Sequence, residues 1–177
     1  MSSTEAKRAG LIARLLDIIE EGVGTYYRNS EVGWNSKKKR KELVDPLARY
    51  IVICEAGGEC PNSIAAFAAF QLSFEETEVN GVERELPIIY CYELHVLPRH
   101  QGKGLGTYLM ELLQEIGSRW NMQAIFLTVF KENWQALKFY QRLGFKPDPI
   151  SPSQYLGGKY ADNYDYEILS KPLLLDA

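Results

Sequence analysis

Cysteine, histidine and excess positive charge are all scarce in this 177-residue sequence. Its 3 cysteines are Cys54, Cys60 and Cys91, and it has 2 histidines. An odd number of cysteines without a CxxC spacing argues against a disulfide framework and against a zinc site. The formal net charge is −3, whereas a general nucleic-acid binder is expected to be basic. We therefore expect a protein of a reducing compartment, the cytoplasm or the nucleus, with no direct nucleic-acid partner.

Long apolar runs are missing as well. The longest runs, such as Ile64–Phe70, are far shorter than the ~20 residues that a membrane helix needs. Residues 1–14 lack the apolar stretch and the small-residue cleavage site of a signal peptide. Hydrophobic residues make up 46% of the chain and charged residues 24%, which excludes a disordered chain. We expect a single domain over residues 1–177, with no membrane partner and no metal.

The first half of the chain predicts a helix followed by strands. Apolar residues recur on one stripe of residues 11–19, and we assign an N-terminal helix to residues 1–25. The acidic segment 75–85 contains Asn80-Gly81 and predicts a hairpin turn. β-branched and aromatic residues predict three strands, at 49–55, 63–75 and 87–96.

A basic run, KKKRK, occupies Lys37–Lys41. It fits a nuclear-import signal or a phosphate-binding patch. Because Glu42 and Asp45 follow directly, the simpler interpretation is a helix whose charged face lies in water. We favour the simpler interpretation and leave the other open.

The second half alternates helices with strands. A loop at 102–106 precedes a helix with leucines on one face, and a second helix is predicted at 133–143 with Gly144 as its C-terminal signal. A segment rich in Ser and Pro, 151–162, predicts a surface loop. The remaining strands are predicted at 124–130, 145–148 and 164–171. This order indicates a mixed α/β sheet, mostly antiparallel, with flanking helices.

The strongest chemical signal is a glycine loop, which we define as Gln101-Gly102-Lys103-Gly104-Leu105-Gly106-Thr107. Glycines let the backbone approach a ligand closely, and the start of the following helix presents unpaired N–H groups. Such a site suits a pyrophosphate. Neither a P-loop, which needs GxxxxGK followed by Ser or Thr, nor the GxGxxG of a dinucleotide-binding fold is present in this segment.

Together with a second motif, the glycine loop resembles the GNAT superfamily of N-acetyltransferases. Gln101-x-x-Gly104-x-Gly106 is similar to that family's acetyl-CoA pyrophosphate loop. Further along, the family pattern N-x-x-A-x-x-F-Y-x-x-x-G-F is matched by Asn133, Ala136, Phe139, Tyr140, Gly144 and Phe145. The resemblance implies a splayed acetyl-CoA cleft in the mixed sheet, a cofactor-binding core at 87–148, and a C-terminal loop and strand at 149–177.

Other segments are similar to the NatD group of this family, which acetylates the N-terminal amines of histone H4 and histone H2-A. These segments are Tyr90–Glu93, Leu127–Lys131, Tyr166–Ser170, and Gly33-Trp34 before the basic helix. The resemblance implies direct transfer from acetyl-CoA to the α-amine of a tail that begins Ser-Gly-Arg-Gly, in a ternary complex and without a metal. We expect a monomer in the cytoplasm and nucleus.

The resemblance assigns cofactor contacts to three places. Backbone groups of Leu94, His95 and Val96 would bind the acetyl end and the pantetheine arm. The glycine loop would bind the pyrophosphate, and Lys103 could add a charge there. Asn133 would bond to the pantetheine arm, although asparagine is also a favoured helix N-cap.

Glu93, Tyr92 and Tyr140 are the residues to which we assign catalysis. Tyr140 would protonate the leaving thiolate, because a phenol with a pKa near ~10 is acidic enough in principle. Glu93 would be the general base through a water, because burial would raise its pKa toward that of the amine. Strand alternation puts Tyr92 and Glu93 on opposite faces, so both reach one site only through an irregular strand or a water chain. The alternatives are a core tyrosine and a carboxylate held by an arginine.

The resemblance also implies a peptide groove lined by Tyr27, Tyr90, Tyr92, Thr128 and Tyr166. Tyrosines offer flat walls and hydroxyl groups to a small, extended N-terminus. Glu75 would bind the arginine at the third position of the tail, and its alternative is a solvated acid at a loop edge. Where the family has a second acid this chain has Thr77, which weakens the case for strict arginine preference.

Two other functions stay open. A sister enzyme of the same fold would acetylate lysine side chains or small amines. A non-catalytic, acetyl-CoA-binding chromatin module would instead use the KKKRK run and bind DNA in a salt-sensitive way. The presence of Glu93 and Tyr140 disfavours the non-catalytic module.

Overall fold

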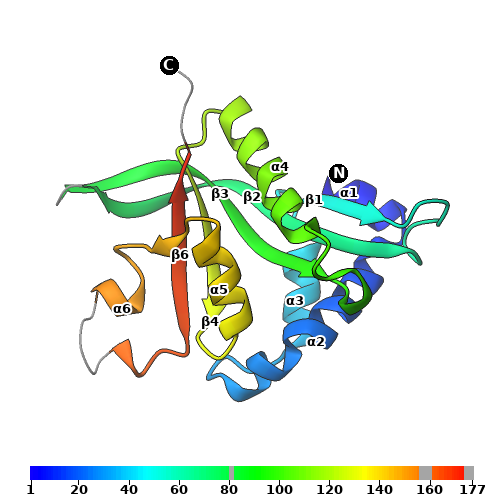
Figure 1. The fold of residues 1–177 in the computed structure, drawn as a ribbon, viewed down its shortest axis with the longest axis horizontal. Helices are drawn as coiled ribbons and strands as arrows, with labels where there is room; N and C mark the ends of the chain where they lie inside the picture. The colour runs from blue at the N-terminus through cyan, green and yellow to red at the C-terminus, as the bar shows by residue number, and fades with distance from the viewer. Residues whose placement is uncertain (80–81, 156–160, 174–177) are drawn as a thin grey trace. The chain divides into compact units, whose positions relative to one another are not determined.

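The computed structural model describes residues 1–79, 82–155 and 161–173 (Figure 1). Six strands form one sheet in the order β1-β2-β3-β4-β6-β5. The strands are β1 (Arg49–Cys54), β2 (Ile64–Val79), β3 (Val82–Val96), β4 (Ala124–Phe130), β5 (Lys146–Pro147) and β6 (Tyr166–Pro172). The helices are α1 (Ser3–Arg8), α2 (Leu11–Asn29), α3 (Ser36–Leu43), the 3-10 helix η1 (Pro98–His100), α4 (Leu105–Arg119), α5 (Trp134–Arg142) and α6 (Pro152–Tyr155).

The pairing of the strands is mixed. β1 with β2, β4 with β6 and β5 with β6 are antiparallel, whereas β3 and β4 are parallel. The parallel pairing runs from Ile88 opposite Ala124 to Cys91 opposite Leu127. The predicted mixed, mostly antiparallel α/β sheet with flanking helices is confirmed. The splayed cleft that the resemblance implies stays a prediction.

The chain forms two compact units. Unit 1 comprises Met1–Gln71 and Tyr92–Glu111, and unit 2 comprises Leu72–Cys91 and Leu112–Ala177. β2, β3 and α4 therefore contribute residues to both units. The single domain expected from the length of the chain stays a prediction.

In unit 1, the first three helices share one apolar core with β1 and β2. The buried residues of α2 recur every three or four positions, and they pack with Tyr50 of β1, Phe67 of β2 and Leu43 of α3. The prediction of a helix from Leu11 is confirmed, and the helix continues to Asn29. The predicted helix at 1–25 is nevertheless wrong as one element, because Gly10 adopts a positive φ of 70° and separates α1 from α2.

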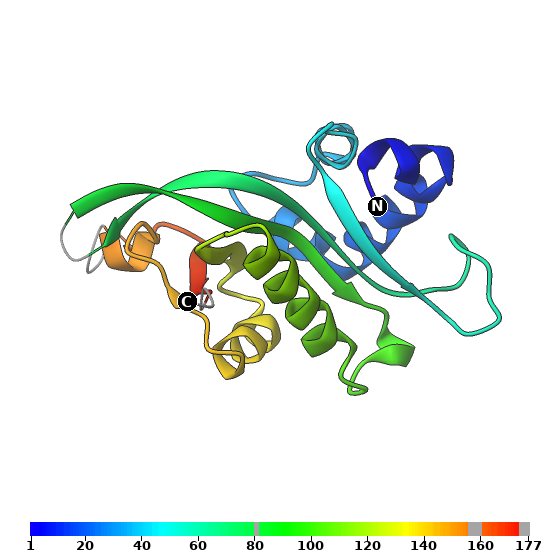
Figure 2. The same ribbon diagram turned by 90° about the horizontal axis from the view of Figure 1, so that it is seen from above.

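The helix α1 lies beside β1 (Figure 2). Its N-cap Ser2 forms a capping box with Glu5 and makes an isolated β-bridge to Arg49. No helix in the described ranges is long and apolar enough to cross a membrane.

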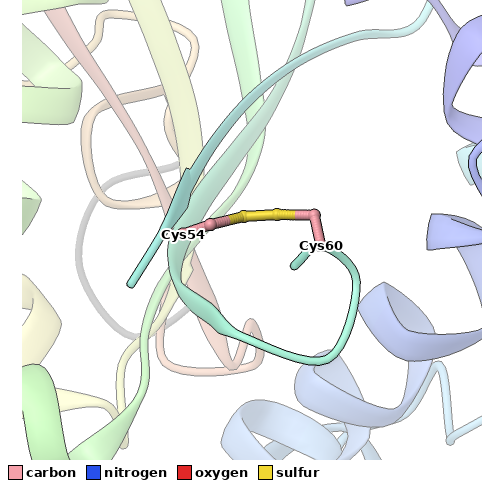
Figure 3. Close-up of a disulfide and its surroundings, with 2 residues drawn as sticks. All are labelled: Cys54 and Cys60. Atoms are coloured by element: carbon pink, nitrogen blue, oxygen red, sulfur yellow. A yellow bond between two sulfur atoms is a disulfide. The ribbon is translucent and has the colours of Figure 1, made fainter. Parts of the chain in front are cut away.

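A disulfide joins Cys54 to Cys60 in unit 1 (Figure 3). The two Cα atoms are 6.2 Å apart, which is within the usual range for a disulfide. The bond connects the end of β1 to the loop before β2. The argument from an odd cysteine count was wrong for this pair, because such a count leaves one residue over, the buried Cys91, and does not prevent the other two from pairing.

Unit 2 is built around β4, which pairs with β3 on one side and β6 on the other. The apolar residues of β4 are buried except Phe130, which is half-buried, and α5 lies along the strand (Figure 1). The predicted strand at 124–130 and helix at 133–143 are confirmed: Asn133 caps α5, and Gly144 follows it with a φ of 89°.

Two predicted loops contain more regular structure than expected. The hairpin turn predicted at 75–85 is mostly strand, because β2 continues to Val79 and β3 begins at Val82. Ser151 and Pro152 are buried and α6 begins at Pro152, so the surface-loop prediction at 151–162 is wrong at its start. Asn80-Gly81 and residues 156–160 lie outside the described residues.

Candidate active site

Glu93 lies in a buried charged cluster of unit 1. It is 7% exposed, its Oε1 accepts a hydrogen bond of 2.9 Å from Lys39 Nζ, and its Oε2 lies 2.8 Å from His95 Nε2. Lys39 Nζ also donates to the Tyr27 hydroxyl at 3.0 Å and pairs with Glu42 Oε2 at 2.8 Å. We call these five residues the Glu93 cluster. It joins α2, α3 and β3.

The cluster keeps the Glu93 carboxyl ionised. Burial by itself would raise the pKa of Glu93, but the hydrogen bond and charge of His95 and the ion pair with Lys39 outweigh burial and hold the pKa below its ordinary value. The predicted rise in this pKa was therefore wrong in direction. The alternative of an arginine partner was also wrong, because a lysine and a histidine hold the carboxylate.

Lys39 is a residue of the site that the sequence analysis missed. Its four neighbours in the KKKRK run are exposed, as expected for a solvated helix face, but Lys39 is only 8% exposed. The spacing contained a signal for this burial. Leu43, which is buried, follows Lys39 by one helical turn, so the two side chains share the face of α3 that packs on the core.

A pocket of about 230 Å³ lies beside the cluster, within unit 1. The polar side chains that line it are Lys39, Glu42, Asp45, Tyr50, Gln71, Tyr92 and Glu93. Three carboxylates against one ammonium give the lining a net negative charge. Burial, followed by the charges of Glu93 and Asp45, raises the pKa of Tyr50, whose hydroxyl donates to the Leu43 carbonyl.

Tyr92 and Glu93 reach the same pocket although they alternate along β3. Tyr92 is 48% exposed and Glu93 is buried, so the predicted alternation is confirmed. Both residues nevertheless line the pocket. Joint action of the two side chains at one site, through an irregular strand or a water chain, stays a prediction.

His95 is enclosed on three sides. Its ring stacks on Phe67 with centroids 5.2 Å apart, it bonds to Glu93, and a Cβ built on Gly22 of α2 would lie 2.8 Å from its Nδ1. Its side chain is therefore part of the buried structure. The predicted cofactor contacts of the backbone at Leu94, His95 and Val96 stay predictions.

The glycine loop lies in unit 1, where it follows η1 and includes the first three residues of α4. The Gln101 side chain donates to the Val96 carbonyl at 3.0 Å and thereby ties the loop to the end of β3. Gly102 and Gly104 have φ values of 72° and 82°, and a Cβ on either would meet nothing within 4 Å. The Gly104 carbonyl accepts from Tyr108 N, so Gly104 begins α4 and the first-turn N–H groups have no partner inside the helix. These features fit a pyrophosphate.

Unit 2 carries Asn133 and Tyr140 on α5. Asn133 Oδ1 accepts from Ala136 N at 3.2 Å, so the N-cap alternative is observed. Tyr140 is 8% exposed, and its ring meets the Phe145 ring edge-on at 5.7 Å, as for a core tyrosine. The cofactor role of Asn133 and the acid role of Tyr140 stay predictions.

Three of the predicted groove residues lie together on one face of unit 2. The hydroxyls of Tyr90 and Thr128 are 2.5 Å apart, and Tyr166 sits opposite Phe130, two residues from Thr128 on the same face of β4. Burial, followed by the charges of Tyr164 and Asp165, raises the pKa of Tyr166. The other two groove residues, Tyr27 and Tyr92, belong to unit 1.

Tyr27 is bound into the Glu93 cluster. Its ring lies edge-on to Trp34 at 5.5 Å, and burial, followed by the charge of Glu93, raises the pKa of its hydroxyl. Its hydroxyl accepts from Lys39, so Tyr27 helps to position a charged group, and its place in a peptide groove stays a prediction.

Glu75 lies on the part of β2 that belongs to unit 2. Burial, followed by the charges of Asp148 and Glu76, raises the pKa of Glu75. The buried Asp148 is therefore a second acid near Glu75, which the sequence analysis missed. The side chain of Thr77, where the family has its second acid, lies outside the described residues.

Metal ligands are not gathered in the part of the chain that the structure describes, where no group of three or more His, Cys, Asp or Glu could hold an ion. Transfer without a metal stays a prediction.

Comparisons with known proteins identify the family. The model of the Acetyltransferase (GNAT) family matches residues 13–145. N-alpha-acetyltransferase 40 of Saccharomyces cerevisiae is 30% identical over 154 residues, which cover 78% of this chain and 52% of that protein. Spermine/spermidine N(1)-acetyltransferase of Bacillus subtilis is 31% identical over 84 residues, which cover 47% of this chain and 53% of that protein. The chain spans about half the length of these curated relatives.

A solved structure agrees with the family match. The crystal structure of Arabidopsis thaliana NAA60 in complex with a bisubstrate analogue has a TM-score of 0.67 with this chain, at 15% identity and 92% coverage of each chain. At this identity the likeness supports the fold alone. The family match extends over the Glu93 cluster, the glycine loop and α5. The chain therefore belongs to the GNAT family of acetyltransferases.

Proposed function

We propose that the protein transfers an acetyl group from acetyl-CoA to the α-amine of protein N-termini, and that its acceptors are the tails of histone H4 and histone H2-A, as in NatD enzymes. The observation that carries this proposal is the acidic pocket with the ionised Glu93 in its wall. An anion in a buried wall attracts an ammonium group. The similarity to N-alpha-acetyltransferase 40 over 78% of the chain supports the same acceptor class.

The low pKa of Glu93 suits an α-amine better than a lysine. An α-amine titrates near ~8 and a lysine near ~10.4, so the α-amine loses its proton more easily by ~2.4 units or ~3 kcal/mol. A carboxylate with a lowered pKa is a weak base, and a weak base suffices for an amine that is partly neutral at pH 7. We therefore assign Glu93 the binding of the ammonium and the reception of its proton through water in the pocket.

The reaction needs few groups from the protein. Acetyl-CoA supplies the acetyl group as a thioester. The neutral amine nitrogen bonds to the acetyl carbon as the carbon–sulfur bond breaks, the surplus N–H proton leaves through water to the solvent, and the departing thiolate takes up one proton, for which Tyr140 is the predicted donor. The glycine loop would hold the pyrophosphate with backbone N–H groups, and Asn133 would hold the pantetheine arm.

The preference for histone tails rests on unit 2. The paired hydroxyls of Tyr90 and Thr128, with Tyr166 beside them, make a flat polar face that suits small Ser and Gly residues. Glu75, with Asp148 nearby, provides negative charge for an arginine at the third position. We expect the protein to be a monomer and to bind such tails in the cytoplasm or nucleus.

The test is acetyl transfer to a Ser-Gly-Arg-Gly-led histone H4 peptide, beside the same peptide with a blocked N-terminus. We expect transfer to the free peptide only, because the α-amine is the acceptor. Replacing the third-position arginine by alanine should lower kcat/KM about tenfold, as for the loss of one charged contact. Equal transfer to the free and blocked peptides would show that lysine is the acceptor.

A second candidate is acetylation of a small polyamine. The acidic lining of the pocket favours it, and so does the similarity to a spermine/spermidine N(1)-acetyltransferase. Acetyl transfer to spermidine, measured beside transfer to the free histone H4 peptide, distinguishes the two candidates. Turnover of spermidine without turnover of the peptide would replace the first proposal by this one. Binding of acetyl-CoA without turnover of either would favour the non-catalytic module.

A further inference from the structure

We propose that Lys39 is a positioning residue, which holds Glu93 ionised and in place in the wall of the pocket. This inference rests on the proposed function, which gives Glu93 its role toward the amine. Lys39 acts through Glu93, so its contribution should disappear when Glu93 no longer carries a charge.

The first argument is the coordination of the ammonium. An ammonium group has three N–H donors, and Lys39 directs them at three oxygens on three elements. These are the Tyr27 hydroxyl of α2 at 3.0 Å, Glu42 Oε2 of α3 at 2.8 Å and Glu93 Oε1 of β3 at 2.9 Å. Such a set fixes the head of a long, flexible side chain in one position.

The second argument is burial. A buried charge is tolerated only when it is paired and hydrogen-bonded. Burial would lower the pKa of Lys39, but the charge of Glu93 and the hydrogen bonds to Glu42 and Tyr27 more than offset burial and raise it. Lys39 therefore stays charged at working pH. Without this charge the pKa of Glu93 would rise, and the pocket would lose its buried anion at a higher pH than in the wild type.

The third argument is the setting of α3, which provides a matched control. Asn35 caps the helix by accepting from Lys38 N at 2.9 Å, and the buried Leu43 fixes which face turns inward. This rotation buries Lys39 and leaves the side chain of Lys38 exposed. Two adjacent lysines on one helix thus differ in burial and contacts but not in charge.

The experiment compares Lys39→Met, Lys39→Arg and Lys38→Met by the pH profile of kcat/KM on the free peptide. In Lys39→Met we expect the acidic limb of the profile to shift to higher pH by at least about one unit. At the pH values that this shifted limb covers, kcat/KM should be about tenfold lower than in the wild type. Lys38→Met should keep the wild-type profile. Lys39→Arg keeps the charge, so its limb should stay close to that of the wild type even if its kcat falls.

Apart from the substituted lysine, the groups that titrate or carry charge around Glu93 are the same in all three variants. They are Tyr27 of α2, Glu42 of α3, Asp45 after α3, Tyr50 of β1 and His95 of β3. A limb that moves equally in Lys38→Met, or in Lys39→Arg as much as in Lys39→Met, would overturn the inference. Lys39→Arg also keeps the test decisive if Lys39→Met does not fold.

Two further measurements separate this inference from the proposed function. In a Glu93→Gln background, Lys39→Met should cause no further loss of activity, and an additive loss would overturn the inference. The carboxyl carbon of Glu93 can be titrated by NMR without any substrate, and Lys39→Met should raise its pKa. If the wild type acetylates no N-terminus but this shift is found, the proposed function fails and the inference about Lys39 stands. An unshifted titration contradicts the inference whatever the activity.

Discussion

Gly22 determines how closely α2 approaches the site, although it has no side chain. A glycine inside a helix costs about 1 kcal/mol relative to alanine, and the packing here accounts for its presence. A Cβ at this position would lie 2.8 Å from Nδ1 of His95. The imidazole has little room to move, because it stacks on Phe67 and bonds to Glu93.

Gly22→Ala should therefore destabilise the protein by about 1–3 kcal/mol through overpacking, measured as the free energy of unfolding in urea. Gly24→Ala in the same helix is the matched control. Its Cβ would meet only the flexible side chains of Arg28 and Glu20, so we expect no loss, or a gain of up to about 1 kcal/mol from helix propensity. Equal stability of the two variants would contradict this account of His95.

At the residue scale, the sequence identified Glu93 but not its environment. Its position in a strand predicted burial, which the structure confirms. The direction of its pKa shift depends on His95, two positions along the strand, and on Lys39, which lies 54 positions away along the chain. No local pattern links Glu93 to Lys39. Asp148, near Glu75, was missed for the same reason.

At the scale of single elements, α5 offers a way to separate two roles of one side chain. Asn133 caps the helix with its amide oxygen, and the proposed cofactor contact would use the same side chain. Serine keeps an oxygen for the cap but lacks the amide, whereas alanine lacks both. The two substitutions therefore distinguish capping from cofactor binding.

Asn133→Ala should lower the free energy of unfolding by about 1 kcal/mol, and Asn133→Ser should leave it nearly unchanged. Both should raise KM for acetyl-CoA about tenfold if the amide binds the pantetheine arm, as for one lost hydrogen bond. Thermal unfolding and initial rates measure the two effects separately. A wild-type KM in Asn133→Ser would leave Asn133 as a cap alone.

The elements that the sequence predicted best are those with strong local patterns. The apolar run of β4 and the cap and glycine of α5 gave bounds close to the observed ones. The helix at the N-terminus was predicted as one element, because a pattern of apolar residues does not show that Gly10 takes a positive φ. Burial of Ser151 was missed because its hydroxyl bonds to Glu167 on β6, which sequence alone does not place nearby.

At the scale of the whole molecule, the Glu93 cluster should make stability depend on acid pH. The pKa of Glu93 is lowered in the folded state, so its stabilisation is fully present above the unfolded carboxyl pKa of about 4.3. It is lost as pH falls through the folded value. We expect the free energy of unfolding to fall below about pH 5, and Glu93→Gln to show a flatter dependence there.

Glu75→Gln is the control for this pH series. The pKa of Glu75 is raised in the folded state, so its ionised form opposes folding at neutral pH and this opposition is relieved as pH falls. Its removal should therefore leave the acid-induced loss of stability in place. An acid dependence of Glu93→Gln as steep as that of the wild type would show that other carboxyls govern acid unfolding.

The burial of Lys39 also changes which side chains of the basic run are accessible to other molecules. Five basic residues are consecutive in the sequence. In the folded helix Lys37, Lys38, Arg40 and Lys41 are exposed, whereas Lys39 is buried. A receptor that binds all five side chains would have to draw the ammonium of Lys39 away from Glu93. Under the proposed role of Lys39, binding of the whole run by such a receptor and acetyl transfer by the same molecule would exclude each other.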